Sequence, residues 1–298
     1  MPDTNPEHTR TALSQGDWRG LPIGSVLERR QLTVSPQRLR DYFYGSGWPL
    51  SNRAAGERLH GRLVAPPSLL FFEPARFDTF VQAMGERPGL NTENRWEYYA
   101  PLRVGEPLTL ELQLGQRWIK RAYEYAEFVM DAFAADGQRV ARGTFVEAWQ
   151  LDVPAPQARN DSAAATRRPS AARSPAAAPY AVQTVHFSLA MSMAISGPGD
   201  FHTDKNIAQA WGYPAPVLAG PQFVVCVAER MRDILGADFW TRGKLQLKLI
   251  RPVFVDSDVE VALFDNSSHR TDATPDFEIQ LRAGGVLSSL ASAALRTD

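Results

Sequence analysis

The strongest candidate for chemistry is His202, which lies in the segment GDFHTD with an aspartate two residues to either side. An imidazole has an ordinary pKa near neutrality, so it can both take and give a proton. A neighbouring carboxylate can orient the ring or act as a second acid or base, and Asp200 is our candidate for that part. Asp204 opens the segment DKNIAQAWG, where we expect it to cap a short helix.

Several other kinds of chemistry lack the residues that they need. Cys226 is the one cysteine of the chain, and we expect a packed core thiol rather than a disulfide or a zinc ligand. No His, Asp or Glu cluster has the spacing of metal ligands, and neither a G-x-G-x-x-G nor a Walker loop is present. We therefore expect no metal and no nucleotide cofactor.

The charge and the hydropathy of the 298 residues bear on partners and location. Thirty-two Lys plus Arg against 33 Asp plus Glu give a formal charge of −1, so no overall basic field attracts nucleic acid or an anionic membrane. The hydrophobic fraction of 44% is typical of a globular protein. We recognise neither a signal peptide nor a membrane span, and we expect a cytoplasmic protein without nucleic-acid or membrane partners.

Helix and strand signals occur in the same order in two halves of the chain. Each half has a helix candidate behind a proline, at residues 68–85 and 222–236. Alternating segments typical of strands lie at residues 108–114, 245–249, 259–263 and 277–281. Residues 101–110 also align without a gap with residues 252–261, as a proline, a tight turn and an alternating strand. This order predicts a duplicated α+β unit in which a sheet wraps a central helix.

Composition divides the chain into four segments. We expect an N-terminal tail at residues 1–20, a first domain at 21–153 and a second domain at 180–298. Between the domains, residues 154–179 are rich in Ala, Pro and Arg and have almost no large apolar residue. Such a segment cannot bury a core, so we expect a linker.

Residues 196–222, SGPGDFHTDKNIAQAWGYPAPVLAGPQ, resemble the signature loop of the MaoC-like (R)-specific enoyl-CoA hydratases. That loop reads S-G-D-x-N-P-(I/L)-H-x-D, then a short helix, G-(F/Y)-P-x-P-(I/V)-(L/V)-H-G and a central helix. The matching positions are His202, Thr203, Asp204, Ala208, Gly212, Tyr213, Pro214, Pro216, Val217, Leu218 and Gly220. The first half is similar to the dehydratase-like domain that often precedes such modules. The resemblance implies a double hot-dog, an α+β fold of two helix-in-sheet halves in one chain.

The resemblance also implies a reaction and the residues that perform it. In that family an Asp and a His flank the acyl chain and move protons, and backbone N–H groups at the start of the central helix hold the thioester oxygen. His202 takes the place of the family's His. Contacts to the oxyanion and the substrate are expected at Gly220, Gln222, Phe223, Gly197 and Gly199. Pro221 has no N–H and cannot be a donor.

The motif departs from the family's pattern where the second acid or base should be. The family's Asp falls on Gly197 and its Asn on Gly199, and Ala219 replaces the His before the helix glycine. Asp200 lies where the family has proline. It replaces the lost carboxylate only if the Gly-Pro-Gly segment takes another path, which glycines permit.

We therefore predict a hydratase or dehydratase that acts on a β-hydroxyacyl or enoyl thioester. The catalytic residues are His202 and Asp200, and coenzyme A or the phosphopantetheine of an acyl carrier protein belongs to the substrate, with no separate cofactor. Two alternatives stay open: a hot-dog enzyme that cyclises or isomerises a polyketide-like enone, and a noncatalytic acyl-binding or partner subunit. The sequence leaves open the acyl chain, the carrier and whether copies of the chain form a homo-oligomer.

Overall fold

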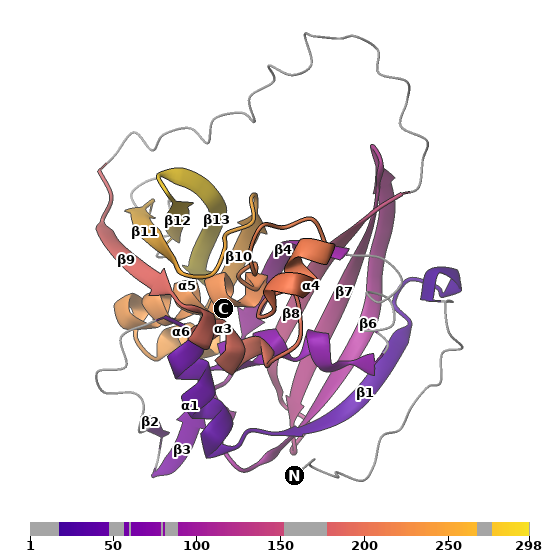
Figure 1. Cartoon of the computed structure of the whole chain (residues 1–298). Helices are drawn as coiled ribbons and strands as arrows, with labels where there is room; N and C mark the ends of the chain where they lie inside the picture. Colours follow the sequence, from indigo (N-terminus) through magenta and orange to yellow (C-terminus); the bar gives the residue numbers. More distant parts are fainter. Residues whose placement is uncertain are drawn as a thin grey trace, which may run out of the picture.

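The computed structural model describes residues 18–47, 57–59, 61–78, 80, 89–151, 178–266 and 276–297. Ten strands in these ranges form one antiparallel sheet in the order β1-β6-β7-β8-β4-β10-β13-β12-β11-β9 (Figure 1). The first half contributes β1 (Val26–Thr33), β4 (Gly89–Tyr98), β6 (Pro107–Lys120), β7 (Tyr123–Ala134) and β8 (Arg139–Gln150). The second half contributes β9 (Ala181–Phe187), β10 (Gly243–Leu249), β11 (Ser257–Asp265), β12 (Asp276–Ala283) and β13 (Val286–Leu295).

The two halves meet where β4 pairs with β10, and Trp96 lies opposite Leu245 in that pair. Outward from this junction, the first half runs β4-β8-β7-β6-β1 and the second runs β10-β13-β12-β11-β9. In each half these are the second, fifth, fourth, third and first strands along the chain. The aligned segments 101–110 and 252–261 lead into β6 and β11, which hold equivalent places. The four predicted strands all form, within β6, β10, β11 and β12.

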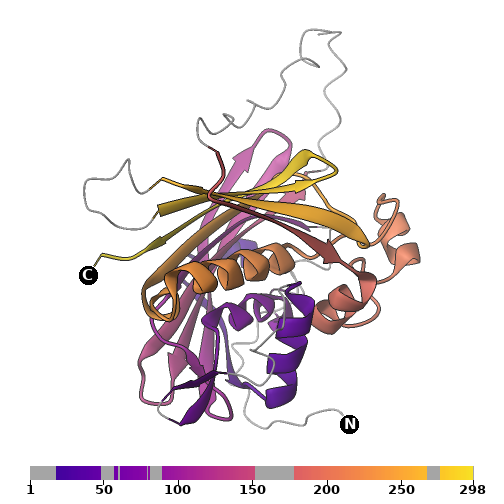
Figure 2. The same ribbon diagram turned by 90° about the vertical axis from the view of Figure 1, so that its left-hand side faces the viewer.

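The central helix of the second half forms as predicted, as α5 (Gly220–Leu235). Figure 2 shows α5 between the strands of the second half and the helices of the first. Its residues from Gln222 to Glu229 are all buried, which suits a helix that is apolar around most of its circumference. Cys226 lies in that stretch as a buried free thiol, so the expected core thiol is confirmed.

The first-half prediction of one helix over residues 68–85 is wrong in its described part. Two short 3-10 helices form instead, η2 (Pro67–Phe72) and η3 (Pro74–Arg76). Pro74 explains the break, because a proline has no N–H to continue a helix. The N–H of Glu73 donates to the carbonyl oxygen of Leu70, which closes η2 as a tight turn. Residue 79 and residues 81–88 lie outside the described residues.

The remaining elements are short. The helices are η1 (Trp18–Gly20), α1 (Pro36–Gly45), α3 (Leu189–Ser196), α4 (Lys205–Ala210) and α6 (Asp238–Arg242), and a small sheet holds β2 (Glu57–Leu59), β3 (Arg62–Ala65) and β5 (Leu102–Arg103). None of the helices in the described ranges has the length and apolar character needed to cross a membrane. Most of the predicted linker and tail, at residues 152–177 and 1–17, lies outside the described residues, so the domain boundaries stay a prediction.

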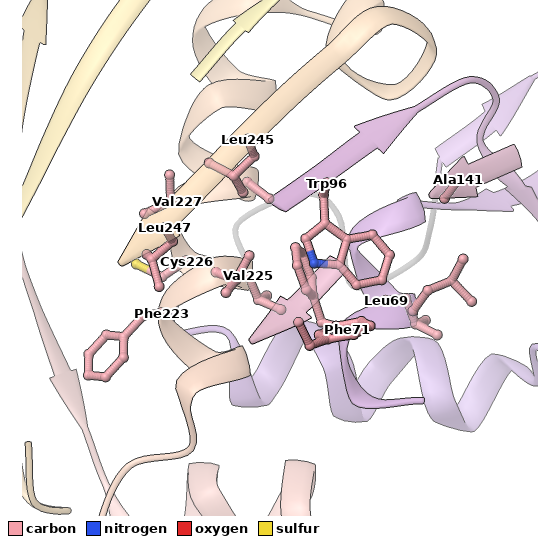
Figure 3. Close-up of a cluster of buried hydrophobic side chains, with 14 of the residues drawn as sticks. Leu69, Phe71, Trp96, Ala141, Phe223, Val225, Cys226, Val227, Leu245 and Leu247 are labelled. Carbon is pink, nitrogen blue, oxygen red and sulfur yellow. The ribbon is translucent and has the colours of Figure 1, made fainter. Parts of the chain in front are cut away.

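The core joins the two halves around Trp96, which points from β4 toward η2 and α5 (Figure 3). Its ring meets the edge of Phe71 from η2 at 4.2 Å and that of Phe145 from β8 at 5.3 Å, as centroid distances. In Figure 3, Val225 of α5 lies to the left of Trp96 and Phe71, and Leu69 of η2 lies to their right. The indole also covers Gly143, where an added Cβ would lie 2.5 Å from the ring. A glycine is therefore needed at that place in β8.

Replacing Gly143 should loosen this core. We expect Gly143→Ala to lower the free energy of unfolding by about 1–3 kcal/mol, because the new methyl group overpacks against Trp96. Urea unfolding of the variant measures the effect. In a Trp96→Phe background the same change should cost less, and an equal cost in both backgrounds would contradict this packing account.

Candidate active site

His202 lies in the loop between α3 and α4, and glycines shape the start of that loop. Gly197 and Gly199 have φ angles of 77° and 89°, a left-handed conformation that side chains strongly disfavour. An added Cβ at either residue would have no neighbour within 4 Å, so the backbone conformation rather than crowding favours glycine. The backbone path of the loop therefore favours glycine at positions 197 and 199, where the resembling motif has Asp and Asn.

Asp200 holds the turn that carries His202. Its Oδ1 accepts the backbone N–H of His202 at 2.8 Å, and the hydroxyl of Thr203 lies 3.1 Å from the same oxygen. The backbone oxygen of Asp200 accepts the N–H groups of Thr203 and Asp204. Asp200 thus fixes the backbone of the loop directly before and after the imidazole.

Asp204 caps α4, as predicted. Its Oδ1 accepts the N–H groups of Asn206 and Ile207 at 2.7 and 3.1 Å. These are donors of the first helical turn, which otherwise lack a partner within the helix. The side chain therefore has a structural role that accounts for its position in the motif.

The ring of His202 is held by the segment that leads into α5. Its Nδ1 lies 2.7 Å from the carbonyl oxygen of Val217. Because a carbonyl oxygen can only accept, Nδ1 carries the hydrogen, and in the neutral ring the lone pair is then on Nε2. The side chain is half-buried, and the face of Phe201 packs on it at a ring distance of 3.9 Å.

Burial lowers the pKa of His202, while the charge of Asp200 and the bond to Val217 act in the opposite direction. The lowered pKa keeps the ring neutral at pH 7, with a free base at Nε2. A neutral imidazole of fixed tautomer can accept a proton from water or a hydroxyl group and return it later.

Val217 brings the loop and the helix start together. Its N–H donates to the carbonyl oxygen of Phe201 at 3.2 Å, and it forms a bridge with Phe254. Leu218 then donates to the carbonyl oxygen of Val253 at 2.8 Å, and α5 begins two residues later at Gly220. The His202 ring is thus anchored three residues before the first turn of α5.

That first turn contains the predicted oxyanion residues. The backbone N–H of Gln222 donates to the carbonyl oxygen of Ala219 at 2.9 Å, so it is already used. The side-chain Oε1 of Gln222 accepts from the N–H of Ala219 and the hydroxyl of Ser192, both at 3.1 Å. Its buried Nε2 has no partner among the described residues. The side-chain amide of Gln222 is therefore a donor in this turn that is free to bind a ligand.

Gly220 and Phe223 pack at the base of the same turn. A Cβ on Gly220 would lie 2.6 Å from Cδ1 of Leu249 and 3.2 Å from Oδ1 of Asn91. The side chain of Phe223 is buried against Phe187, at 5.7 Å between ring centroids. Glycine at 220 therefore lets the positive end of α5 come close to β4 and β10.

A buried polar cluster, missed by the sequence analysis, lies beneath this helix start. Asn91 of β4 donates through Nδ2 to Oε1 of Glu147 in β8 at 2.6 Å, and Asn94 donates to Oδ1 of Asn91 at 2.5 Å. Burial raises the pKa of Glu147 to about 8, against which the Asn91 bond acts. The signal in the sequence was a lone carboxyl group in the apolar strand segment FVEAW.

Two hollows of about 400 and 390 Å³ lie on the first half of the molecule. The first is lined by residues that include Val64, Arg103 and Leu108, and the second by residues that include Trp118 and Tyr125. His202 lines neither of them. The acyl slot beside His202 therefore stays a prediction. Among the described residues, no group of three or more His, Cys, Asp or Glu side chains could hold a metal ion.

Comparisons with known proteins bear on the fold. No protein-family model matches the chain, and no curated protein matches it in sequence. A MaoC-like dehydratase from Phytophthora capsici has a similar structure, with a TM-score of 0.68 and 16% identity over 92% of this chain and 97% of that one. A conserved hypothetical protein from Mycobacterium tuberculosis with a double hotdog fold has a TM-score of 0.57 and 14% identity over 94% and 98% of the two chains.

The chain has a double hot-dog fold. The full-length peroxisomal multifunctional enzyme type 2 from Drosophila melanogaster contains a similar structure, with a TM-score of 0.67 and 17% identity over 90% of this chain. The present chain spans about half (48%) of that enzyme's length. The expected α+β double hot-dog is confirmed, although in the described residues the first half lacks a long central helix.

The buried carboxyl group of Glu147 should make stability depend on pH. The unfolded chain loses this proton near pH 4.5, whereas the folded protein holds it to about pH 8, so the free energy of unfolding should fall as pH rises between these values. Each unit of pKa difference corresponds to about 1.4 kcal/mol as an upper bound. Denaturant unfolding at a series of pH values measures the slope.

Glu147→Gln should flatten this slope, because its side-chain oxygen still accepts from Asn91 but cannot ionise. Glu260→Gln, at an exposed position of β11, is the matched control and should leave the slope unchanged. Equal slopes for the wild type and Glu147→Gln would contradict the buried, protonated state of Glu147.

Proposed function

We propose that this protein is a hydro-lyase that adds water to an enoyl thioester, or removes it from a β-hydroxyacyl thioester, with His202 as the general acid and base. The observation that carries the proposal is the bond between Nδ1 of His202 and the carbonyl oxygen of Val217. This bond leaves Nε2 as the base, on a ring anchored beside the start of α5. Coenzyme A or an acyl carrier protein carries the acyl group and is part of the substrate.

Hydration then needs one proton to leave water and one to reach the substrate. Nε2 of His202 takes a proton from water as the water oxygen bonds to the β carbon, and negative charge gathers on the thioester oxygen. The N–H of Gly220 and the amide Nε2 of Gln222 hold that oxygen at the positive end of α5. Return of the proton from His202 to the α carbon completes the addition, and dehydration reverses these steps.

Asp200 supports this step in two ways. Its Oδ1 holds the His202 backbone, and its charge raises the pKa of the ring, which favours the imidazolium that forms when Nε2 takes a proton. Gly197 and Gly199 give the loop the path on which Asp200 reaches the backbone N–H of His202. We therefore assign Asp200 as the residue that positions His202 and stabilises its charged form, in place of the carboxylate absent at Gly197.

Removing the base should lower the rate. We expect His202→Ala to reduce kcat by about 10²- to 10⁴-fold, which is the usual contribution of a general acid or base. The loss of enoyl-thioester absorbance on adding purified protein follows the reaction. A His202→Ala variant that hydrates at the wild-type rate would refute the assignment.

Asp200 offers a matched pair of variants. Asp200→Asn retains an oxygen for the His202 N–H but removes the charge, whereas Asp200→Ala removes both. We expect both variants to be slower, with the larger loss in Asp200→Ala, because only that change also frees the loop backbone. Equal activity of the wild type and both variants would contradict this role.

The rate should also depend on the protonation of His202. Since only the neutral ring is a base and burial lowers its pKa below the ordinary 6.5, kcat/KM should fall toward acid pH with a midpoint below 6.5. A profile of kcat/KM against pH provides the test. A midpoint above pH 6.5 would contradict a neutral, desolvated imidazole.

The glycine at position 197 favours one alternative, a noncatalytic acyl-binding protein that lost the family's carboxylate. Tight binding of acyl thioesters of several chain lengths without any hydration by the wild type would support it. Conversion of a carrier-free enone that survives removal of Asp200 would instead support the cyclising or isomerising enzyme.

A further inference from the structure

Among the described residues, the cluster of Asn91, Asn94 and Glu147 has one fully buried polar atom without a partner. Glu147 is 3% exposed and Asn94 is 2% exposed. Oε1 of Glu147 accepts from Asn91, while Oε2 is buried and has no partner within the described part of the chain. Buried polar atoms are almost always paired, so an unpaired one in a folded protein calls for a ligand or a water.

The protonation of Glu147 gives this atom a definite chemistry. With the pKa raised to about 8 by burial, the carboxyl group is neutral at pH 7. Because Oε1 already accepts a hydrogen bond, the proton is on Oε2, which makes that atom a donor. A neutral donor in an apolar interior suits an uncharged oxygen acceptor.

The location of the cluster connects it with the acyl group. Asn91 lies under the start of α5, where its Oδ1 would be 3.2 Å from a Cβ on Gly220. Asn91 and Glu147 are direct partners in the β4–β8 pair, so the carboxyl group lies one strand farther into the first half. An acyl chain whose thioester oxygen is held at Gly220 and which extends over β4 would pass this donor.

We propose that Asn91, Asn94 and Glu147 form a binding site for an uncharged oxygen, a carbonyl or hydroxyl group, on the acyl chain of the substrate. The proposal rests on the proposed function for the placement of the thioester at the start of α5. It assigns an oxygenated acyl group to the substrate, in preference to a plain alkyl chain. A plain chain would leave Oε2 buried with its proton unpaired.

Binding rather than turnover tests this site. The probes are octanoyl-CoA and a set of analogues in which one carbonyl group is moved carbon by carbon along the chain. For the wild type, we expect the best oxo analogue to bind about tenfold more tightly than octanoyl-CoA, as measured by titration calorimetry at pH 7. Equal binding of all analogues, or no binding of any, would overturn the proposal.

Two substitutions of Glu147 separate the donor from the shape of the site. Glu147→Gln should keep the preference, because its oxygen accepts from Asn91 while its NH₂ group donates in place of Oε2. Glu147→Met has a similar length but no donor, and it should lose the preference. A preference that survives in Glu147→Met would overturn the proposal, and Glu260→Met at an exposed site is the control.

A measurement on the wild type keeps the proposal testable if Glu147→Met does not fold. The carbonyl stretching band of the protonated Glu147 carboxyl group, assigned by its absence in Glu147→Gln, should shift to lower frequency with the best oxo analogue and not with octanoyl-CoA. An unchanged band would overturn the proposal. If the protein binds oxo analogues in this way but hydrates no enoyl thioester, the proposed function fails while the binding site stands.

Discussion

Val217 binds the His202 loop through both of its backbone polar groups. Its N–H donates to Phe201 and its carbonyl oxygen accepts from the His202 ring. The same residue bridges to Phe254 and leads into α5, so one extended segment joins the sheet, the loop and the helix start. Any shift of Val217 would move the imidazole and the first turn of α5 together. In the proposed reaction, that coupling keeps the base and the oxyanion site in a fixed relation, which acid/base chemistry requires.

The burial of the first turn of α5 is the second constraint on the site. The helix is buried among strands of the second half and the short helices of the first, so its first turn must find partners inside the protein. The side-chain oxygen of Gln222 accepts hydrogen bonds from the N–H of Ala219 and the hydroxyl of Ser192. The absence of a side chain at Gly220 allows close contact with Asn91 and Leu249. Among the described residues, Nε2 of Gln222 and Oε2 of Glu147 are buried here without a partner, and in our proposals the substrate supplies one. Burial makes an unpaired polar atom costly, and for the same reason it strengthens the hydrogen bond of that atom to a ligand.

The sequence was most informative where local patterns decide structure. Alternation predicted the strands in β6, β10, β11 and β12, and the cap at Asp204 followed from the preference of aspartate for that position. The predicted helix over residues 68–85 does not form as one helix. The prediction gave more weight to the apolar spacing than to Pro74, and η2 ends with its cap at Glu73, directly before that proline. Local patterns did not predict the Glu147 cluster, since Glu147 is 56 positions from Asn91 and meets it only through the β4–β8 pairing. Likewise, a sequence does not show which ring nitrogen of His202 faces a carbonyl oxygen.

The tautomer and the pKa of the His202 ring can be measured directly. Nitrogen NMR of protein labelled with ¹⁵N-histidine reports the tautomer and the pKa of each imidazole, and a His202→Gln variant assigns the signal of His202 among the five histidines of the chain. We expect a neutral ring with hydrogen on Nδ1, a free Nε2 and a pKa below 6.5. A ring with hydrogen on Nε2, or one that is still protonated above pH 6.5, would contradict it.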